Sequence, residues 1–190
     1  MKAFGRFAAL LVAVMLILTA CSPKGKVNPP DLKRSFLCTA EMDYDGMTIK
    51  AQFDRTAVGV WSAEVLEPER LKGMRLEMKD GEVKLNFLGL SFAVPKKALP
   101  VKAAAEQIFD VLDNAADSVG TEFSKKGNTI EAAGEADGNP YTFSLDANTG
   151  ALLSFAMPNV SLKADFTDFQ FVENMPETVA DSISENAPAP

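Results

Sequence analysis

The chain of 190 residues contains no histidine, the residue most often used as a general base and as a metal ligand. It also lacks a Gly-x-Ser-x-Gly segment, a glycine-rich phosphate loop and the Cys/His spacing of a zinc site. Asp43-x-Asp45-Gly46 matches the start of a calcium-binding loop, but the later ligands and the closing glutamate are missing. Asp-Gly is also a common hairpin turn. We therefore expect a protein that is not an enzyme and that binds no metal or dissociable cofactor.

Cysteine is scarce, with Cys21 and Cys38 as its two occurrences. Cys38 falls on the apolar side of a segment in which apolar and polar residues alternate. A buried cysteine behaves as a small hydrophobe. A reactive thiol and a link between two chains are the alternatives for a lone cysteine in an exported protein. We expect Cys38 to belong to the core.

Long apolar runs are also absent, since residues 7–18 are 12 apolar residues and a spanning helix needs about 20. Lys2 and Arg6 provide the basic residues that an export signal carries before its apolar region. The run ends in Leu18-Thr19-Ala20-Cys21, which resembles the lipobox of bacterial lipoproteins. That resemblance implies a signal peptide over residues 1–20 and covalent diacylglycerol on Cys21. The alternative is an ordinary secretory signal that happens to contain a cysteine.

Basic residues are fewer than acidic residues in this chain. Without Lys2 and Arg6 the chain has 17 basic and 26 acidic residues, a formal charge of −9. Such a chain is a poor ligand for nucleic acid and is repelled by anionic headgroups. Two acyl chains hold a protein stably on a bilayer. The lipobox therefore implies a lipid-anchored protein on the extracytoplasmic face of a bacterial membrane. We expect the cell membrane rather than the outer membrane.

The two ends of the chain are polar and rich in proline. Residues 21–33 have no apolar period, and we expect a lipidated tether there. Residues 173–190 end in Ala-Pro-Ala-Pro and are expected to form a flexible tail. Residues 34–172 remain as one domain of ordinary size.

Within this domain the dominant period is two, which is typical of β-strands. Short turn sequences such as Asp45-Gly46 and Gly127-Asn128 separate the alternating segments. Short connections favour an antiparallel meander of about nine to eleven strands. The expected strands cover residues 36–44, 49–53, 58–66, 74–78, 83–87, 90–94, 122–126, 130–135, 141–145, 153–157 and 160–166, the last continuing toward Phe171.

A single segment changes to helical periodicity. Apolar residues in 101–119 recur at steps of three and four, which predicts an amphipathic helix. Pro100 suits its first turn and Gly120 suits its C-terminal end. The apolar side of this helix must be buried, and the sheet offers the large apolar surface. The sequence therefore predicts an α+β fold, mainly β, in which a curved antiparallel sheet or incomplete β-barrel packs around one amphipathic helix.

The order of these segments is similar to that of the LolA-like half-barrel family. This family includes lipoprotein carriers and acceptors, mycobacterial glycolipid-binding lipoproteins and clostridial germination-specific lipoproteins. The resemblance covers residues 34–171 and is carried by residues 66–73, 74–78, 80–81, 88–95, 99–116 and 145–150. Carriers of the family begin with a long helix, whereas here about a dozen proline-rich residues precede the first strand. Carrier residues are therefore not transferred to positions of this chain.

The resemblance implies a concave apolar surface that accepts a lipid or the acyl chain of a lipoprotein. The residues that could line it are Phe53, Trp61, Met74, Met78, Phe87, Phe92, Phe143 and Phe155. Apolar residues at strand spacing are more often ordinary core, so a fully packed half-barrel is the alternative. In that case we expect a protein that binds another exported protein through a sheet edge or the outer face of the sheet. An open apolar pocket of several hundred Å³ would favour the lipid, and a filled core with an exposed apolar edge would favour the protein partner.

Overall fold

The computed structural model describes residues 27, 30–79, 81–93, 100–117 and 120–172. The expected signal peptide, the lipidation site at Cys21, most of the tether and the tail lie outside these residues. None of the helices in the described part of the chain is long and apolar enough to cross a membrane.

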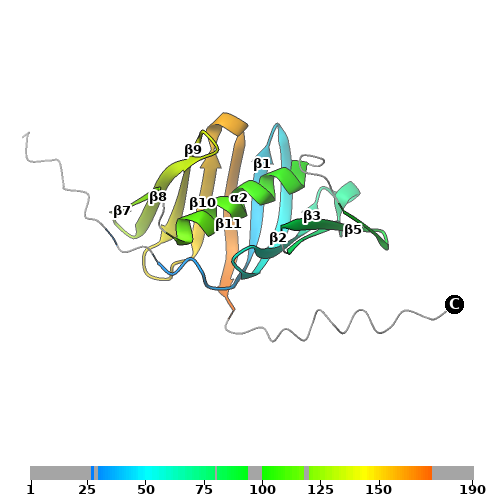
Figure 1. Cartoon of the computed structure of the whole chain (residues 1–190), viewed down its shortest axis with the longest axis horizontal. Helices are drawn as coiled ribbons and strands as arrows, with labels where there is room; N and C mark the ends of the chain where they lie inside the picture. The colour runs from blue at the N-terminus through cyan, green and yellow to red at the C-terminus, as the bar shows by residue number, and fades with distance from the viewer. Residues whose placement is uncertain (1–26, 28–29, 80, 94–99, 118–119, 173–190) are drawn as a thin grey trace, which may run out of the picture.

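The described residues form one sheet of eleven antiparallel strands, in the order β6-β5-β4-β3-β2-β1-β11-β10-β9-β8-β7 (Figure 1). Alternating burial along the strands follows the alternation of apolar and polar residues in the sequence. The strands are β1 (Phe36–Tyr44), β2 (Met47–Ala57), β3 (Val60–Glu67), β4 (Arg75–Lys79), β5 (Glu82–Phe87), β6 (Leu90–Ala93), β7 (Thr121–Lys126), β8 (Thr129–Ala136), β9 (Asn139–Asp146), β10 (Leu152–Met157) and β11 (Leu162–Phe171).

Two meanders meet in the middle of this sheet. The first runs from β1 outward to β6, and the second runs from β7 inward to β11. The two are joined by the pairing of β1 with β11, in which Phe36 lies opposite Phe171 and Tyr44 opposite Leu162. The sheet is not closed, so β6 and β7 are its two edges.

The α-helix α2 (Pro100–Ala116) lies across one face of the sheet, which curves around it (Figure 1). Its buried residues are Val101, Lys102, Ala104, Ala105, Ile108, Phe109, Val111, Leu112 and Ala115. They share one core with the inward-facing residues of the strands. The predicted mainly β fold, an open antiparallel sheet with one helix, is confirmed.

Two predicted strands differ in detail from those of the structure. Val58 was expected at the start of a strand, but it lies in the turn between β2 and β3 and is exposed. Leu153 was expected to face inward, but a register shift between Leu152 and Ser154 buries Leu152 and leaves Leu153 39% exposed. A β-bulge inserts a residue into the alternation, and the period of two does not reveal where.

Most strand ends also differ from the prediction by one or more residues. For example, β2 ends at Ala57 where residue 53 was expected, and β4 begins at Arg75 where Met74 was expected. Val160 was expected in the last strand, but it belongs to a short 3-10 helix, η3 (Pro158–Val160), and β11 starts at Leu162. Helical periodicity extended to Val119, whereas α2 ends at Ala116, and Val119 lies outside the described residues. Helix ends are poorly specified by periodicity because the last turn contributes few core contacts.

Candidate functional site

The concave face of the sheet is filled by α2. Five of the eight residues expected to line a concavity belong to the core that sheet and helix share and are at most 4% exposed: Phe53, Trp61, Met74, Phe143 and Phe155. The ring of Trp61 stacks on Phe109 of α2, with centroids 4.6 Å apart and planes 13° apart. Phe53 also contacts Phe109, at a centroid distance of 5.0 Å. Phe53 and Trp61 therefore pack against the helix.

A small apolar cavity remains near one end of the core. Its volume is about 20 Å³, and its lining includes Phe36, Leu112, Leu145 and Leu152. About 10–15 Å³ of such volume holds one water molecule, whereas ligand pockets measure about 300–1,000 Å³. An acyl chain does not fit in this cavity while α2 is in place.

A buried ion pair connects α2 to the sheet. Arg55 of β2 is 1% exposed, and its guanidinium donates to the carboxylate of Asp113 on α2. Asp113 also accepts the backbone N–H of Gly59 at 2.7 Å. Arg55 donates in addition to the backbone oxygen of Leu32, so that one side chain joins the sheet, the helix and the segment before β1. The expected strand ended at residue 53. Because alternate residues of a strand share a face, continuing the same alternation by two residues would have predicted that Arg55 is buried.

The three other expected lining residues lie toward the β5–β6 end of the sheet. Met78 and Phe87 are half-buried, and Phe92 is 47% exposed. Leu88 and Leu90, on the same hairpin, are 84% and 61% exposed. We call Leu88, Leu90, Phe92 and the outer backbone of Leu90–Ala93 the β6 edge. Each of these large side chains would gain about 1.5–3 kcal/mol on full burial.

The turn within this hairpin has unusual residues. Leu88 and Gly89 have φ angles of 52° and 79°, close to those of Asp45-Gly46 (48° and 78°) and of Asp137-Gly138 (49° and 77°). Asp and Asn tolerate this left-handed region, whereas a leucine there is strained by about 1 kcal/mol or more. Sequence reasoning missed Leu88 and Leu90 as functional candidates. The signal was Leu-Gly at a position where the β1–β2 and β8–β9 turns have Asp-Gly.

The two sheet edges differ in how they are protected. Among the described residues, β6 pairs with β5 alone, so the main-chain groups along its other side have no strand partner. The four side chains of β6 are all exposed and none is charged. By contrast, β7 ends in Lys125 and Lys126, and lysines on an edge strand discourage pairing with another chain. Within the part of the chain that the structure describes, the β6 edge therefore lacks the lysines that protect the β7 edge.

The outer face beside the β6 edge is polar. Glu64, Arg75, Asn86 and Ser91 form a cross-strand row, and they line an open groove of about 340 Å³ together with the hairpin turn. Arg75 in this row forms ion pairs with Glu64 at 3.6 Å and with Glu77 at 2.9 Å.

A larger groove, of about 980 Å³, lies over β7–β10. Eight of its fourteen lining residues are polar, including Ser144, Ser154, Glu122 and Glu131, and the apolar ones include the expected lining residue Phe143. Ser144 and Ser154 are hydrogen-bonded to each other at 2.6 Å, and Glu131 pairs with Lys126 at 2.6 Å. Ligand pockets are lined predominantly by apolar side chains, whereas more than half of the residues of this groove are polar.

Ionisable groups in the described part of the chain give little sign of a reactive centre. No group of three or more His, Cys, Asp or Glu among these residues is placed to hold a metal ion. Burial raises the pKa of the Cys38 thiol to about 12, so that it stays protonated at neutral pH. Burial also raises the pKa of Asp54, and the nearby charge of Arg75 partly offsets this effect.

Comparisons with known proteins give matches to solved structures alone. No family model matches the chain. The search of curated proteins gives no match.

Three of the structural matches illustrate the sequence identities and TM-scores found. An uncharacterised conserved protein of Thermus thermophilus is 12% identical with a TM-score of 0.49, over 76% of this chain and 83% of that chain. A putative outer membrane lipoprotein-sorting protein domain of Vibrio parahaemolyticus is 11% identical with a TM-score of 0.43, over 80% and 91%. A LolA superfamily protein of Nitrosomonas europaea is 7% identical with a TM-score of 0.37, over 78% and 90%. The chain thus has distant structural matches that include lipoprotein-sorting and LolA superfamily domains, and these assign it no activity or ligand.

Proposed function

We propose that this protein is a lipid-anchored lipoprotein of the bacterial cell envelope whose β domain binds an extended segment of another exported protein at the β6 edge. The observation that carries the proposal is the combination of a filled concave face with an uncharged, apolar edge strand whose outer side has no strand partner among the described residues. The anchoring part rests on the lipobox-like Leu18-Thr19-Ala20-Cys21.

Strand addition explains the residues of this edge. An incoming strand takes up the unpaired N–H and C=O groups of Leu90–Ala93. Side chains alternate across a sheet, so every second residue of the incoming strand faces the same side as Leu90 and Phe92. Leu90 lies opposite Phe87, and Phe92 lies opposite the buried Leu85, which places both on the concave side of the sheet. Hydrogen bonds thus contribute affinity and the two apolar side chains contribute specificity.

Binding of a lipid or an acyl chain in the concave face, which the family resemblance implies, is the competing function. It requires α2 to move away from Phe53 and Trp61 and to break the Arg55–Asp113 pair. An experiment should therefore separate an edge partner from an acyl ligand in the same cells.

A photoreactive residue in place of Ser91, on the outer side of β6, provides this test. We expect crosslinking in intact cells to give a discrete protein adduct that disappears when Leu90→Ser and Phe92→Ser are added. The same photoreactive residue in place of Ser124 on β7 is the matched control and should not give that adduct. Circular dichroism verifies that the variants fold.

Two results would contradict the proposal. One is the absence of an edge-dependent adduct at Ser91. The other is a stoichiometric lipid, found by solvent extraction and mass spectrometry of the chain from residue 21 with Cys21→Ser, together with no adduct. The second result would favour the acyl-binding function.

The anchor is tested separately. Cys21→Ala removes the thiol that receives diacylglycerol, so we expect the precursor to remain uncleaved by the lipoprotein signal peptidase and to take up no radioactive palmitate. Cys38→Ala is the matched control and should be labelled like the unmodified chain. Normal labelling of the Cys21→Ala variant would refute lipidation at this position.

A further inference from the structure

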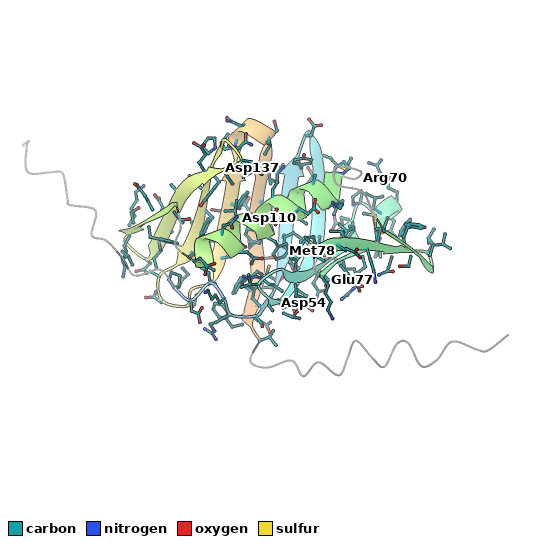
Figure 2. All side chains as sticks on the ribbon, in the orientation of Figure 1. Asp54, Arg70, Glu77, Met78, Asp110 and Asp137 are labelled. Atoms are coloured by element: carbon teal, nitrogen blue, oxygen red, sulfur yellow. The ribbon has the colours of Figure 1, made fainter. Side chains whose placement is uncertain are left out.

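The charges of this chain are distributed unevenly along the sheet. Residues 36–93, which contain β1 to β6, have seven basic and ten acidic residues, a net charge of −3. Residues 70–93, which contain β4 to β6, have five basic and three acidic residues, a net charge of +2. Residues 100–172, which contain α2 and β7 to β11, have four basic and eleven acidic residues, a net charge of −7. Figure 2 shows Glu77 and Met78 in one half of the sheet and Asp137 in the other. The β6 edge therefore lies in a segment of net positive charge, residues 70–93, of an acidic protein.

One charged side chain faces outward next to β6. The strand β6 pairs with Lys84, Leu85, Asn86 and Phe87 of β5, and Lys84 is the charged residue of this set. Its neighbours Val83 and Leu85 are buried, so Lys84 points to the outer face, where it is exposed. The carboxylate of Glu77, opposite Lys84 on β4, pairs with Arg75. Lys84 itself forms no ion pair with a described residue.

On the outer face of the sheet, the β6 residue next to Lys84 is small. Ala93 is the β6 residue opposite Lys84, and its side chain is a single methyl group. Neighbouring strands lie about 4.8 Å apart, so a residue added beyond Ala93 has its Cα about 10 Å from that of Lys84. A glutamate or aspartate at that position of the incoming strand can form an ion pair with Lys84, because the small side chain of Ala93 between them does not block the contact. An incoming lysine or arginine in that place would meet a like charge.

We infer that the β6 edge selects an extended segment that alternates apolar and acidic residues. Its apolar side chains pack on Leu90 and Phe92 on the concave side, and its carboxylate lies over Ala93 and pairs with Lys84 on the outer side. This inference rests on the proposed function and names the chemical class of the partner. A second copy of this chain does not fit, because a second β6 edge supplies uncharged side chains and no carboxylate for Lys84.

Dye-labelled peptides test the inference by fluorescence anisotropy with the chain from residue 21 carrying Cys21→Ser. The described fold lies within residues 27–172, so this chain contains all of it. Three ten-residue peptides alternate valine with glutamate, with serine or with lysine. We expect the glutamate peptide to bind about fivefold more tightly than the serine peptide at low salt, the scale of one exposed ion pair, and the lysine peptide to bind more weakly than both.

Exchanging the charge on the protein gives the sharpest readout. Lys84→Glu should reverse the order, so that the lysine peptide binds more tightly than the glutamate peptide. Lys125→Glu on β7 makes the same change in net charge at the other edge and should leave the order unchanged. A reversal with Lys84→Glu alone supports a direct pair, whereas a reversal with both variants would indicate net charge alone and overturn the assignment of Lys84.

The remaining outcomes separate this inference from the proposed function. Equal binding of the three peptides, with the Ser91 adduct present in cells, overturns the acidic preference and leaves strand addition standing. No peptide binding and no adduct overturns both. Sedimentation with phosphatidylglycerol vesicles that is lost with Leu90→Ser and Phe92→Ser, in a chain that binds no peptide, overturns both in favour of a membrane-binding edge.

Discussion

Trp61 is the side chain at which an expected ligand site and an ordinary core differ most clearly. It is 3% exposed and stacks on Phe109, so the structure places it in the packing between sheet and helix. Truncating a buried tryptophan costs about 3–5 kcal/mol.

We therefore expect Trp61→Ala to lower the free energy of unfolding by about 3–5 kcal/mol, measured by urea denaturation. Phe92→Ala removes an aromatic residue of the same predicted set that is 47% exposed, and it should cost far less. A nearly neutral Trp61→Ala variant that has lost a bound ligand would instead place Trp61 in a binding site.

Cys38 gives a prediction about reactivity. It is 1% exposed and its pKa is raised to about 12 by burial, whereas an unperturbed thiol ionises near pH 8.5. The thiolate is the reactive form. The folded chain with Cys21→Ser should therefore resist iodoacetamide at pH 8 and react fully in urea, as followed by mass spectrometry.

A thiol introduced by Ser91→Cys, on exposed β6, is the positive control and should react rapidly in the folded state. Fast alkylation of native Cys38, or a disulfide-linked dimer through it, would contradict its place in the core.

Among the secondary-structure elements, β10 is where local register decides what a sequence change does. Leu152 and Leu153 are adjacent leucines, and the bulge between Leu152 and Ser154 buries the first to 3% exposure and turns the second outward. Leu152→Ala should lower the free energy of unfolding by about 2–5 kcal/mol, and Leu153→Ala by about 0.5 kcal/mol or less. Chemical denaturation of the two variants checks this. Equal losses would mean that β10 keeps an unbroken alternation.

Sequence periodicity predicted most of the elements because alternating burial and alternating residue type go together in a sheet with one face covered. It predicted β1, β5 and α2 well, since their inward positions are apolar almost without exception. It failed at Val58 and Leu153, where a turn and a bulge interrupt the period. Turn geometry depends on a few backbone angles that apolar residues such as Leu88 can also adopt.

The candidate site could be predicted less well. The period of two placed Phe53, Trp61 and Phe143 on the inner face, but it did not say whether α2 would fill the space above them. That depends on the volume of side chains such as Phe109, which come from a segment far away in the sequence. The exposure of Leu90 and Phe92 depends likewise on how far along the sheet the helix extends.

For the whole molecule, the pair of Arg55 and Asp113 is the polar link between helix and sheet. Asp113→Asn keeps the shape of the side chain but leaves the buried guanidinium without its counter-charge. We expect a loss of about 3 kcal/mol in the free energy of unfolding.

Asp117→Asn is the matched control just beyond the end of the same helix. It removes the ion pair with Lys33, whose two side chains are 57% and 64% exposed, and should cost less than about 1 kcal/mol. Urea denaturation compares the two variants. Similar losses would mean that Arg55 is solvated in solution.

The pairing of β1 with β11 also bears on when this fold can form. The strand synthesised last within the described fold lies in the middle of the sheet, against the strand synthesised first. Each meander can form from local contacts. The two meanders can pair only when β1 and β11, which are about 130 residues apart in the sequence, meet, and such non-local pairing is slow. A nascent chain whose end has not yet emerged therefore cannot complete its sheet. For a chain that is exported unfolded, this delay keeps it competent for translocation until synthesis is nearly finished.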